Sequence, residues 1–154
     1  MSLANWKTSS KRTYEDGLIL KYWQAHGDLV FTEVPVGRDG PRQWPEGARP
    51  RRIDGVRIVS SEVEKAPSAI VAFSKSRDAI RFEQTILGAE VEVLEVKRSL
   101  DRVVLGQVII GADLLEIEYA PSKIDQVVIC EVGDPVLETV CDRRGIKVWM
   151  PPKR

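Results

Sequence analysis

The sequence predicts an α/β fold, with one domain over residues 1–154 and a central mixed β-sheet flanked by helices. Apolar runs rich in Val and Ile alternate along the chain with segments of helical periodicity. The hydrophobic content of 43% is enough for a sizeable core. A long helical segment, residues 100–118, stands between two strand-like runs and predicts a right-handed parallel crossover.

The N-terminal part of the chain predicts a helix and two strands. Residues 11–26 place aromatic and apolar side chains at near-helical spacing, and Gly27 can end that helix. The apolar runs 28–36 and 52–60 predict strands. Residues 37–51 are rich in Gly, Pro and Arg and predict the loop between them.

Two segments carry weaker patterns. The polar residues 1–10 predict a flexible N-terminus. Residues 61–88 form an insert between the second and third long strands. Its first part, 61–75, is ambiguous, and residues 69–73 could form a short strand. The second part of the insert, 76–87, predicts a helix that Gly88 ends. The pattern does not say what the insert does.

The C-terminal half alternates strands with helices, in the order 89–98, 100–118, 124–132, 135–144 and 146–150. Asp134 is suited to cap the second of these helices, Pro135 to its first position, and Gly145 to its end. In the helix 100–118, the residues expected to face mostly inward are Val103, Val104, Gln107, Val108, Ile110, Gly111, Leu114 and Leu115. The first three long strands can form an antiparallel meander, followed by the crossover and a C-terminal helix and strand.

Composition favours a cytoplasmic protein that does not enter membranes. No apolar run approaches the roughly 20 residues of a membrane span, and Met1–Ser10 lacks the apolar core of a signal peptide. Cys130 and Cys141 fit buried thiols of a reducing compartment, and with the single His26 they exclude a conventional structural zinc site. Lys plus Arg and Asp plus Glu both total 23, so strongly basic, promiscuous nucleic-acid binding is not expected.

Four polar residues occupy positions where a plain core would be apolar. Asp54 lies inside the second strand, Glu95 and Lys97 inside the third, and Gln107 on the helix that follows. Because side chains alternate along a strand, Glu95 and Lys97 are expected on one face. Carboxylates from adjacent strands suit Mg²⁺, and the carbonyl of Val96 could add a third oxygen. Such a site with a cation beside it suits phosphodiester cleavage.

The order and spacing of these residues resemble the PD-(D/E)XK nuclease superfamily, which has the restriction-endonuclease-like fold. The family's strand aspartate would match Asp54, and its Glu-x-Lys would match Glu95-Val96-Lys97. Its helical acid would match Glu15, and the glutamine of some branches would match Gln107. The resemblance covers residues 11–132 and includes an α-β-β-β-α-β core. Ile53 stands where the family often has proline, and the gap between the two acidic strands is long.

The resemblance implies Mg²⁺- or Mn²⁺-dependent hydrolysis of phosphodiester bonds, with DNA expected as the substrate and RNA left open. Asp54, Glu95 and Val96 would bind the metal, Lys97 would stabilise the transition state, and Glu15 and Gln107 would support the site. Arginines 49, 51 and 52 form a basic cluster beside the second strand, suited to phosphate. A homodimer is compatible with this fold.

Other interpretations of the same residues stay open. Glu33 competes with Glu15 as the third acid, and Arg143-Arg144 is a second basic cluster. Asp54 could pair with an arginine, and Glu95 with Lys97 across a solvated face. In that case the chain would be a plain structural domain whose charged residues form surface pairs. A further alternative is a catalytically silent nuclease-like module that binds nucleic acid or a protein partner.

Overall fold

The computed structural model describes residues 6–7, 12–60, 68–73 and 76–154. Trp6 and Lys7 are described, but the rest of the predicted flexible terminus 1–10 lies outside the described residues. So do residues 61–67 and 74–75 of the ambiguous segment 61–75. The elements are α1 (Tyr14–His26), β1 (Leu29–Gly37), β2 (Pro50–Ser60), β3 (Ala69–Ala72), α2 (Ser76–Ile86), β4 (Glu90–Val96), α3 (Arg102–Glu118), β5 (Lys123–Ile129), α4 (Pro135–Arg144) and β6 (Lys147–Trp149).

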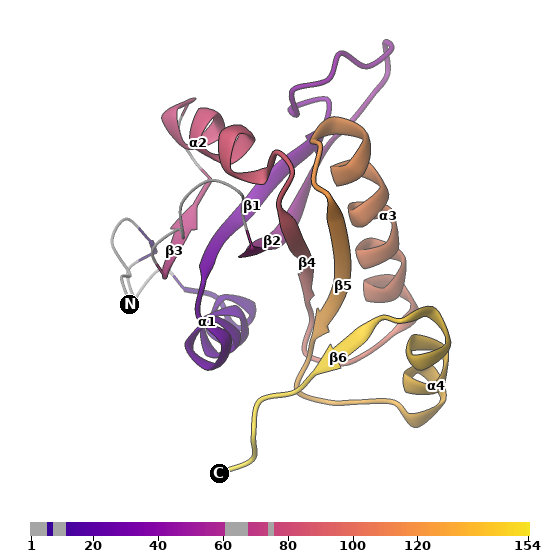
Figure 1. The fold of residues 1–154 in the computed structure, drawn as a ribbon. Coiled ribbons are helices and arrows are strands. Elements are labelled where there is room, and N and C mark those ends of the chain that lie inside the picture. Colours follow the sequence, from indigo (N-terminus) through magenta and orange to yellow (C-terminus); the bar gives the residue numbers. More distant parts are fainter. Residues whose placement is uncertain (1–5, 8–11, 61–67, 74–75) are drawn as a thin grey trace.

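The described strands form one mixed six-stranded sheet in the order β3-β1-β2-β4-β5-β6 (Figure 1). As predicted, β1, β2 and β4 form an antiparallel meander, and β5 returns parallel to β4 after α3. The short strand left open in the insert exists as β3 and pairs in parallel with β1 at one edge. The mixed sheet flanked by four helices confirms the predicted α/β class.

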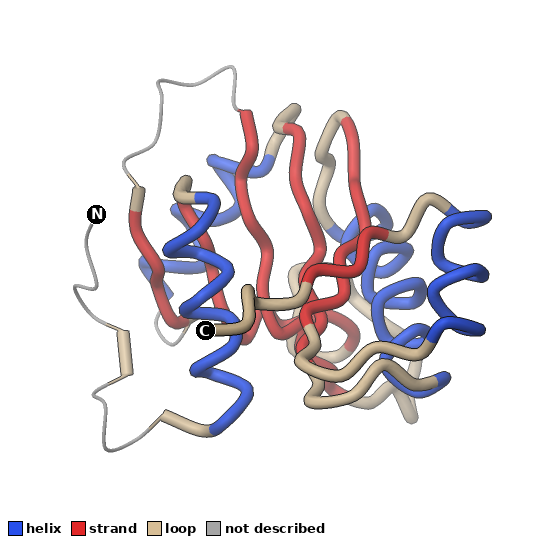
Figure 2. Tube along the Cα trace, turned by 90° about the horizontal axis from the view of Figure 1, so that it is seen from below, coloured by secondary structure: helices blue, strands red, loops and turns tan. Residues whose placement is uncertain are grey.

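Helices cover both faces of the sheet, with α1 alone on one side (Figure 2). On that side Leu18, Ile19 and Trp23 of α1 pack on β4 and β5 side chains such as Leu94 and Val127. On the other side α2, α3 and α4 bury the larger apolar cluster, which includes Phe82, Val108 and Cys141. No helix among the described residues is both long and apolar enough to cross a membrane.

Side-chain caps fix where the helices begin. Thr13 Oγ1 accepts the amide of Asp16 at 3.1 Å while Asp16 Oδ2 accepts the amide of Thr13 at 2.9 Å, so α1 starts with a reciprocal capping box. Asp101 Oδ1 accepts the amide of Val104 at 2.9 Å and starts α3. Asp134 caps α4 and Gly145 ends it, as predicted.

One prediction about α3 is wrong. The side chains of Val103, Gln107 and Ile110 were expected to face inward. Gln107 is exposed, and Val103 and Ile110 are 59% and 52% exposed. The helix instead packs on the sheet through residues on a narrower face, namely Val104, Leu105, Val108, Gly111, Ala112 and Leu115. The apolar side chains of α3 therefore cover a wider part of the helix surface than the part that packs on the sheet, and some of them are exposed to solvent.

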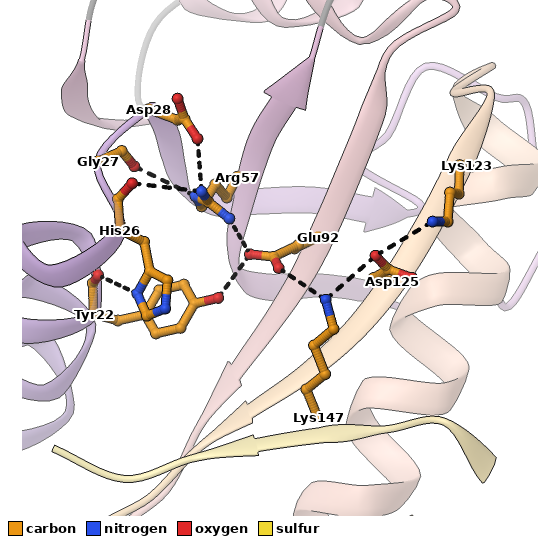
Figure 3. A network of polar contacts seen from close by, with 9 residues as sticks. All are labelled: Tyr22, His26, Gly27, Asp28, Arg57, Glu92, Lys123, Asp125 and Lys147. Carbon is orange, nitrogen blue, oxygen red and sulfur yellow. Dashed lines mark hydrogen bonds and ion pairs between the residues drawn. The ribbon is translucent and has the colours of Figure 1, made fainter.

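A buried ionic network ties α1 to the sheet (Figure 3). Glu92 of β4 is only 4% exposed, and its carboxylate accepts the Tyr22 hydroxyl at 2.7 Å and Arg57 Nη1 at 2.7 Å. Arg57 also donates to Asp28 Oδ2 at 2.6 Å, and Lys147 approaches Glu92 at 3.7 Å. The ring of His26 stacks on Tyr22 with centroids 4.0 Å apart. Since each charged group of this network has a partner of opposite charge, we interpret the network as stabilising the packing of α1 on the sheet.

Candidate functional site

Three acidic residues stand in one row across three neighbouring strands. In the β1–β2 ladder, Thr32 pairs with Gly55 and Val34 with Ile53, so Glu33 falls opposite Asp54. In the β2–β4 ladder, the last pair is Gly55 with Leu94, and one further step brings Asp54 opposite Glu95. The sheet therefore gathers the row Glu33, Asp54 and Glu95 from β1, β2 and β4.

The backbone is irregular along this row. Glu33 has φ of 57°, in the left-handed region that a non-glycine residue seldom adopts inside a strand. Beyond the last ladder pair, Asp54 Oδ2 accepts the main-chain amide of Val96 at 2.8 Å. A side chain thus replaces a ladder acceptor where β2 and β4 stop pairing. Strained backbone of this kind costs of the order of 1–3 kcal/mol and often marks a functional site.

Glu95 is buried against Asp54. Glu95 is only 4% exposed. Gly111 of α3 packs against its side chain, and a Cβ added at Gly111 would lie 3.5 Å from Glu95 Oε1. Burial, then the charge of Asp54, and then the hydrogen bond to Asp54 raise the pKa of Glu95 to about 10. At neutral pH the Glu95 carboxyl is therefore protonated, and it can donate a hydrogen bond to Asp54.

A cavity of about 570 Å³ opens beside this pair on the α3 side of the sheet. We call it the α3-side cavity; its walls are Val36, Arg51, Arg52, Ile53, Asp54, Glu95, Val103, Gly106, Gln107, Ile110, Gly111 and Leu114. It brings two carboxyl groups, two guanidinium groups and one amide around a largely apolar wall. Five residues selected from the sequence therefore meet here: Arg51, Arg52, Asp54, Glu95 and Gln107.

A smaller cavity of about 180 Å³ lies on the α1 side. We call it the α1-side cavity; its walls are Lys7, Thr13, Glu15, Asp16, Ile19, Thr32, Glu33, Asp54 and Val96. Lys7 Nζ bridges Asp16 at 3.1 Å and Glu33 at 3.5 Å. Asp54 borders both cavities. Both candidates for the third acid, Glu15 and Glu33, thus share this cavity with Asp54.

Lys97 makes an ion pair just beyond the end of β4. Strand β4 ends at Val96, and Lys97 Nζ lies 2.5 Å from Asp101 Oδ2, four residues along. This ion pair lowers the pKa of Asp101 through its hydrogen bond to Lys97. Lys97 lines neither the α1-side nor the α3-side cavity, so the expected cleft of Asp54, Glu95 and Lys97 holds for the two acids alone. Arg49 likewise is exposed and lies outside both walls.

The donor set around Asp54 was compared with what a divalent cation needs. Among the described residues, no group of three or more Asp, Glu, His or Cys side chains could hold a metal ion. Two carboxylates remain, and Mg²⁺ is commonly bound by one or two carboxylates with water in the other positions. The pair Asp54 and Glu95 therefore fits a hydrated Mg²⁺ or Mn²⁺, on condition that Glu95 gives up its proton.

The sequence interpretation missed some of the residues that line the α1-side cavity, Lys7 and Thr32 among them. Lys7 reaches Asp16 and Glu33 from the N-terminal segment, and Thr32 accepts the indole N–H of Trp6 at 3.3 Å. The pattern Thr13-x-x-Asp16 did carry a signal, because it has the spacing of a capping box. Nothing in the sequence indicates the contacts of Lys7, because Asp16 and Glu33 lie on two different elements further along the chain.

Comparison with protein-family models, with curated proteins and with solved structures finds no match for this chain. The site is therefore interpreted from its own residues.

Proposed function

We propose that this chain is a cytoplasmic, metal-dependent nuclease with the restriction-endonuclease-like fold, which hydrolyses phosphodiester bonds in DNA. The observation that carries the proposal is the buried pair of Asp54 and Glu95, with the pKa of Glu95 raised to about 10, on the wall of a cavity that Arg51 and Arg52 also line. Strongly shifted carboxyl pKa values in a cleft are typical of functional sites. The element order of the described chain agrees with this family, as does the meander that presents the acids.

Each residue has a role that its position allows. Asp54 and Glu95 would hold Mg²⁺ or Mn²⁺, with the Val96 carbonyl as a third candidate oxygen. The bound cation would polarise a phosphoryl oxygen and lower the pKa of an attacking water. Arg51 and Arg52 would bind backbone phosphates bidentately, and the Gln107 amide would orient the scissile group. Glu15, which lines the α1-side cavity together with Asp54, would position the attacking water.

Glu95 imposes a pH dependence on metal binding. Its carboxyl must lose a proton before it can act as a ligand, and that proton is held up to a pH of about 10. Affinity for Mg²⁺ or Mn²⁺ should therefore rise about tenfold for each pH unit between roughly pH 6 and 9. Calorimetric titration in two buffers of different ionisation enthalpy should show about one proton released per cation bound. A flat pH dependence contradicts Glu95 as a ligand.

The direct test is cleavage of labelled single- and double-stranded DNA and RNA, with and without Mg²⁺ or Mn²⁺. The wild-type chain should cut DNA only with the cation. Asp54→Ala and Glu95→Gln should each lose at least about a hundredfold in rate. Glu90→Gln is a matched control, because Glu90 is an exposed acid on the same strand. Cation-independent cleavage, or full activity of both site variants, would refute the proposal.

One observation favours the second candidate, a catalytically silent nuclease-like module that binds nucleic acid or a protein partner. Lys97, the expected transition-state cation, is paired with Asp101 just past the end of β4 and lines neither cavity. A silent module should bind DNA through Arg51 and Arg52 with the same affinity whether or not Asp54 is replaced by Ala. Binding without cleavage under every cation tested would establish it.

A further inference from the structure

One side of α3 carries large apolar side chains in solvent. Val103, Ile110 and Ile117 are 59%, 52% and 51% exposed, and they recur every seven residues along the helix. Val103 and Ile110 also wall the α3-side cavity, together with Arg51 and Arg52 of β2. Apolar surface of this regularity on a helix is typical of an interface.

Gln107 and Leu114 lie between these three residues and complete a continuous row. Steps of four and three residues alternate from Val103 through Gln107, Ile110 and Leu114 to Ile117. This is the heptad spacing that forms one straight seam on a helix. We call these five residues the α3 stripe. It is nearly symmetric about Ile110, so two copies running in opposite directions would place Ile110 against Ile110 and Val103 against Ile117.

The charges beside the stripe point to the same arrangement. Arg102 lies in the first turn of α3, whereas Asp113 and Glu116 lie in its second half, and all three are exposed. The helix has no acid in its first turn and no base in its last, so its charges oppose the macrodipole rather than complement it. None of these three residues takes part in an ion pair formed within the described residues. An antiparallel second copy would place its acidic half beside Arg102.

We propose that α3 pairs with α3 of a second copy of this chain, antiparallel about a two-fold axis at Ile110. The contact is isologous, because one self-complementary patch serves both copies. Apolar residues of the stripe leave water, and Arg102 of each copy meets Glu116 of the other. The pairing does not depend on the proposed hydrolysis.

The size of the helix sets the strength of this contact. With 17 residues, α3 is about 25 Å long, and a single helix face covers less than the roughly 800 Å² per partner of a standard stable interface. A dissociation constant in the micromolar range, about 1–100 µM, is therefore expected. Val103, Gln107, Ile110 and Leu114 also wall the α3-side cavity. The second copy would therefore cover Gln107 and narrow the cavity opposite Arg51 and Arg52, so the proposed hydrolysis would belong to the monomer.

Sedimentation velocity across about 1–200 µM should show wild-type protein passing from monomer to dimer. Ile110→Lys should shift the midpoint at least tenfold to higher concentration, because it places two like charges at the axis. Ile80→Lys is a matched control, since Ile80 is an isoleucine 58% exposed on α2. Arg102→Glu and Glu116→Arg should each weaken the dimer, and the double variant should restore it.

Cysteine crosslinking tests the geometry of the pair. Only a residue on the two-fold axis faces itself, so Ile110→Cys alone should form a disulfide-linked dimer under mild oxidation. Val103→Cys alone and Ile117→Cys alone should not crosslink, whereas the two substitutions together should. The native thiols do not interfere, because Cys130 and Cys141 are both fully buried.

Three results would overturn the proposal. They are a wild-type chain that stays monomeric over the whole range, an Ile110→Lys variant that dimerises like wild type, and crosslinking through Val103→Cys alone. Cleavage is therefore assayed well below about 1 µM, where the chain is monomeric. Absence of cleavage there counts against the nuclease and leaves the pairing intact, so the two failures are distinguishable.

Discussion

The carboxylate of Asp54 accepts the main-chain amide of Val96 at 2.8 Å, just past the last pair of the β2–β4 ladder. One acidic side chain thereby closes a gap in the sheet and presents its charge to Glu95. Asp54 therefore has two roles, one in the fold and one in the proposed site. The hydrogen bond requires only an acceptor, whereas a metal site requires the negative charge. The two requirements can be separated by substitution.

Replacing Asp54 by Asn should preserve the fold and remove the charge, because the amide oxygen can still accept the Val96 amide. Asp54→Ala should instead leave that amide without its partner and lower the free energy of unfolding by about 1–3 kcal/mol. Chemical denaturation of both variants measures the difference. Equal stability of the two variants contradicts a structural role for the Val96 hydrogen bond.

Asp54→Asn should also lower the pKa of Glu95, since the charge of Asp54 is one of its causes. Titration of the Glu95 carboxyl by carbon-detected NMR in both proteins would show this. Burial remains in the variant, so the pKa should stay above its usual range.

Glu95→Gln should stabilise the protein at neutral and alkaline pH. Glu95 ionises near 4.5 in the unfolded chain and at about 10 when folded, so between these values the folded state holds a proton that the unfolded state lacks. The free energy of unfolding therefore falls as pH rises through this window, by at most about 3 kcal/mol at pH 7. The amide mimics the protonated acid and removes this loss.

Melting curves from pH 5 to pH 9 should show the variant gaining on wild type as pH rises. Glu90→Gln, on the exposed start of β4, should follow the wild-type curve. A Glu95→Gln variant that is less stable than wild type at pH 8 would show that the Glu95 carboxylate is a favourable structural partner.

Removing Arg57 should be costly, because Glu92 would remain as a buried charge. Arg57 Nη1 lies 2.7 Å from Glu92, whose side chain is 6% exposed, and breaking such a buried pair typically costs about 3–5 kcal/mol. Arg57→Met should therefore lower the melting temperature strongly, and adding Glu92→Gln should recover part of the loss. Lys147→Met should cost less than about 1 kcal/mol, since Lys147 is 59% exposed and 3.7 Å from Glu92. Equal losses for the two single variants would contradict this account.

Much of the fold follows from local signals in the sequence. The starts of α3 and α4 are set by Asp101 and Asp134, and the end of α4 by Gly145. Strand β3 has four residues and pairs in parallel at an edge, so its place depends on distant partners that no local pattern specifies. The exposure of Ile110 could not be predicted either, because the sheet contact of α3 is narrower than its apolar pattern.

The candidate site was predictable where register alone decides it. Asp54 and Glu95 meet because two strands of a meander run side by side, which the pattern indicates. Lys97 does not join them, because β4 ends one residue earlier and Asp101 lies within reach four residues on. The left-handed backbone of Glu33 has no signature in the sequence.

Glu118 should hold the loop between β1 and β2 in place. Its carboxylate accepts the Trp44 indole N–H at 2.8 Å and the Gly37 amide at 3.0 Å. Glu118→Ala removes both bonds, so trypsin should cut at the exposed arginines 38 and 42 several times faster. Glu116→Ala, two residues earlier and exposed, is the matched control. Unchanged cleavage of Glu118→Ala would mean that other contacts hold the loop.

Nucleic-acid affinity should depend on Arg51 and Arg52, because the net charge of the chain is zero and only a local patch can attract phosphate. Each phosphate contact releases condensed counterions, so binding should weaken steeply with salt. Arg51→Gln combined with Arg52→Gln should lower affinity for all DNA sequences alike. It should also reduce the slope of the logarithm of the binding constant against the logarithm of the salt concentration by about two.

The matched control for this pair is Arg143→Gln with Arg144→Gln, because these two arginines are exposed on α4 away from the acid pair. Arg49→Gln adds a graded comparison, since Arg49 belongs to the same cluster but lies outside the α3-side cavity. Fluorescence anisotropy with labelled DNA at several salt concentrations gives each slope. Cation affinity should change little in any of these variants, because Asp54 and Glu95 stay in place. A wild-type salt slope in the Arg51 and Arg52 double variant, with a flattened slope in the α4 control, would move the substrate path to α4.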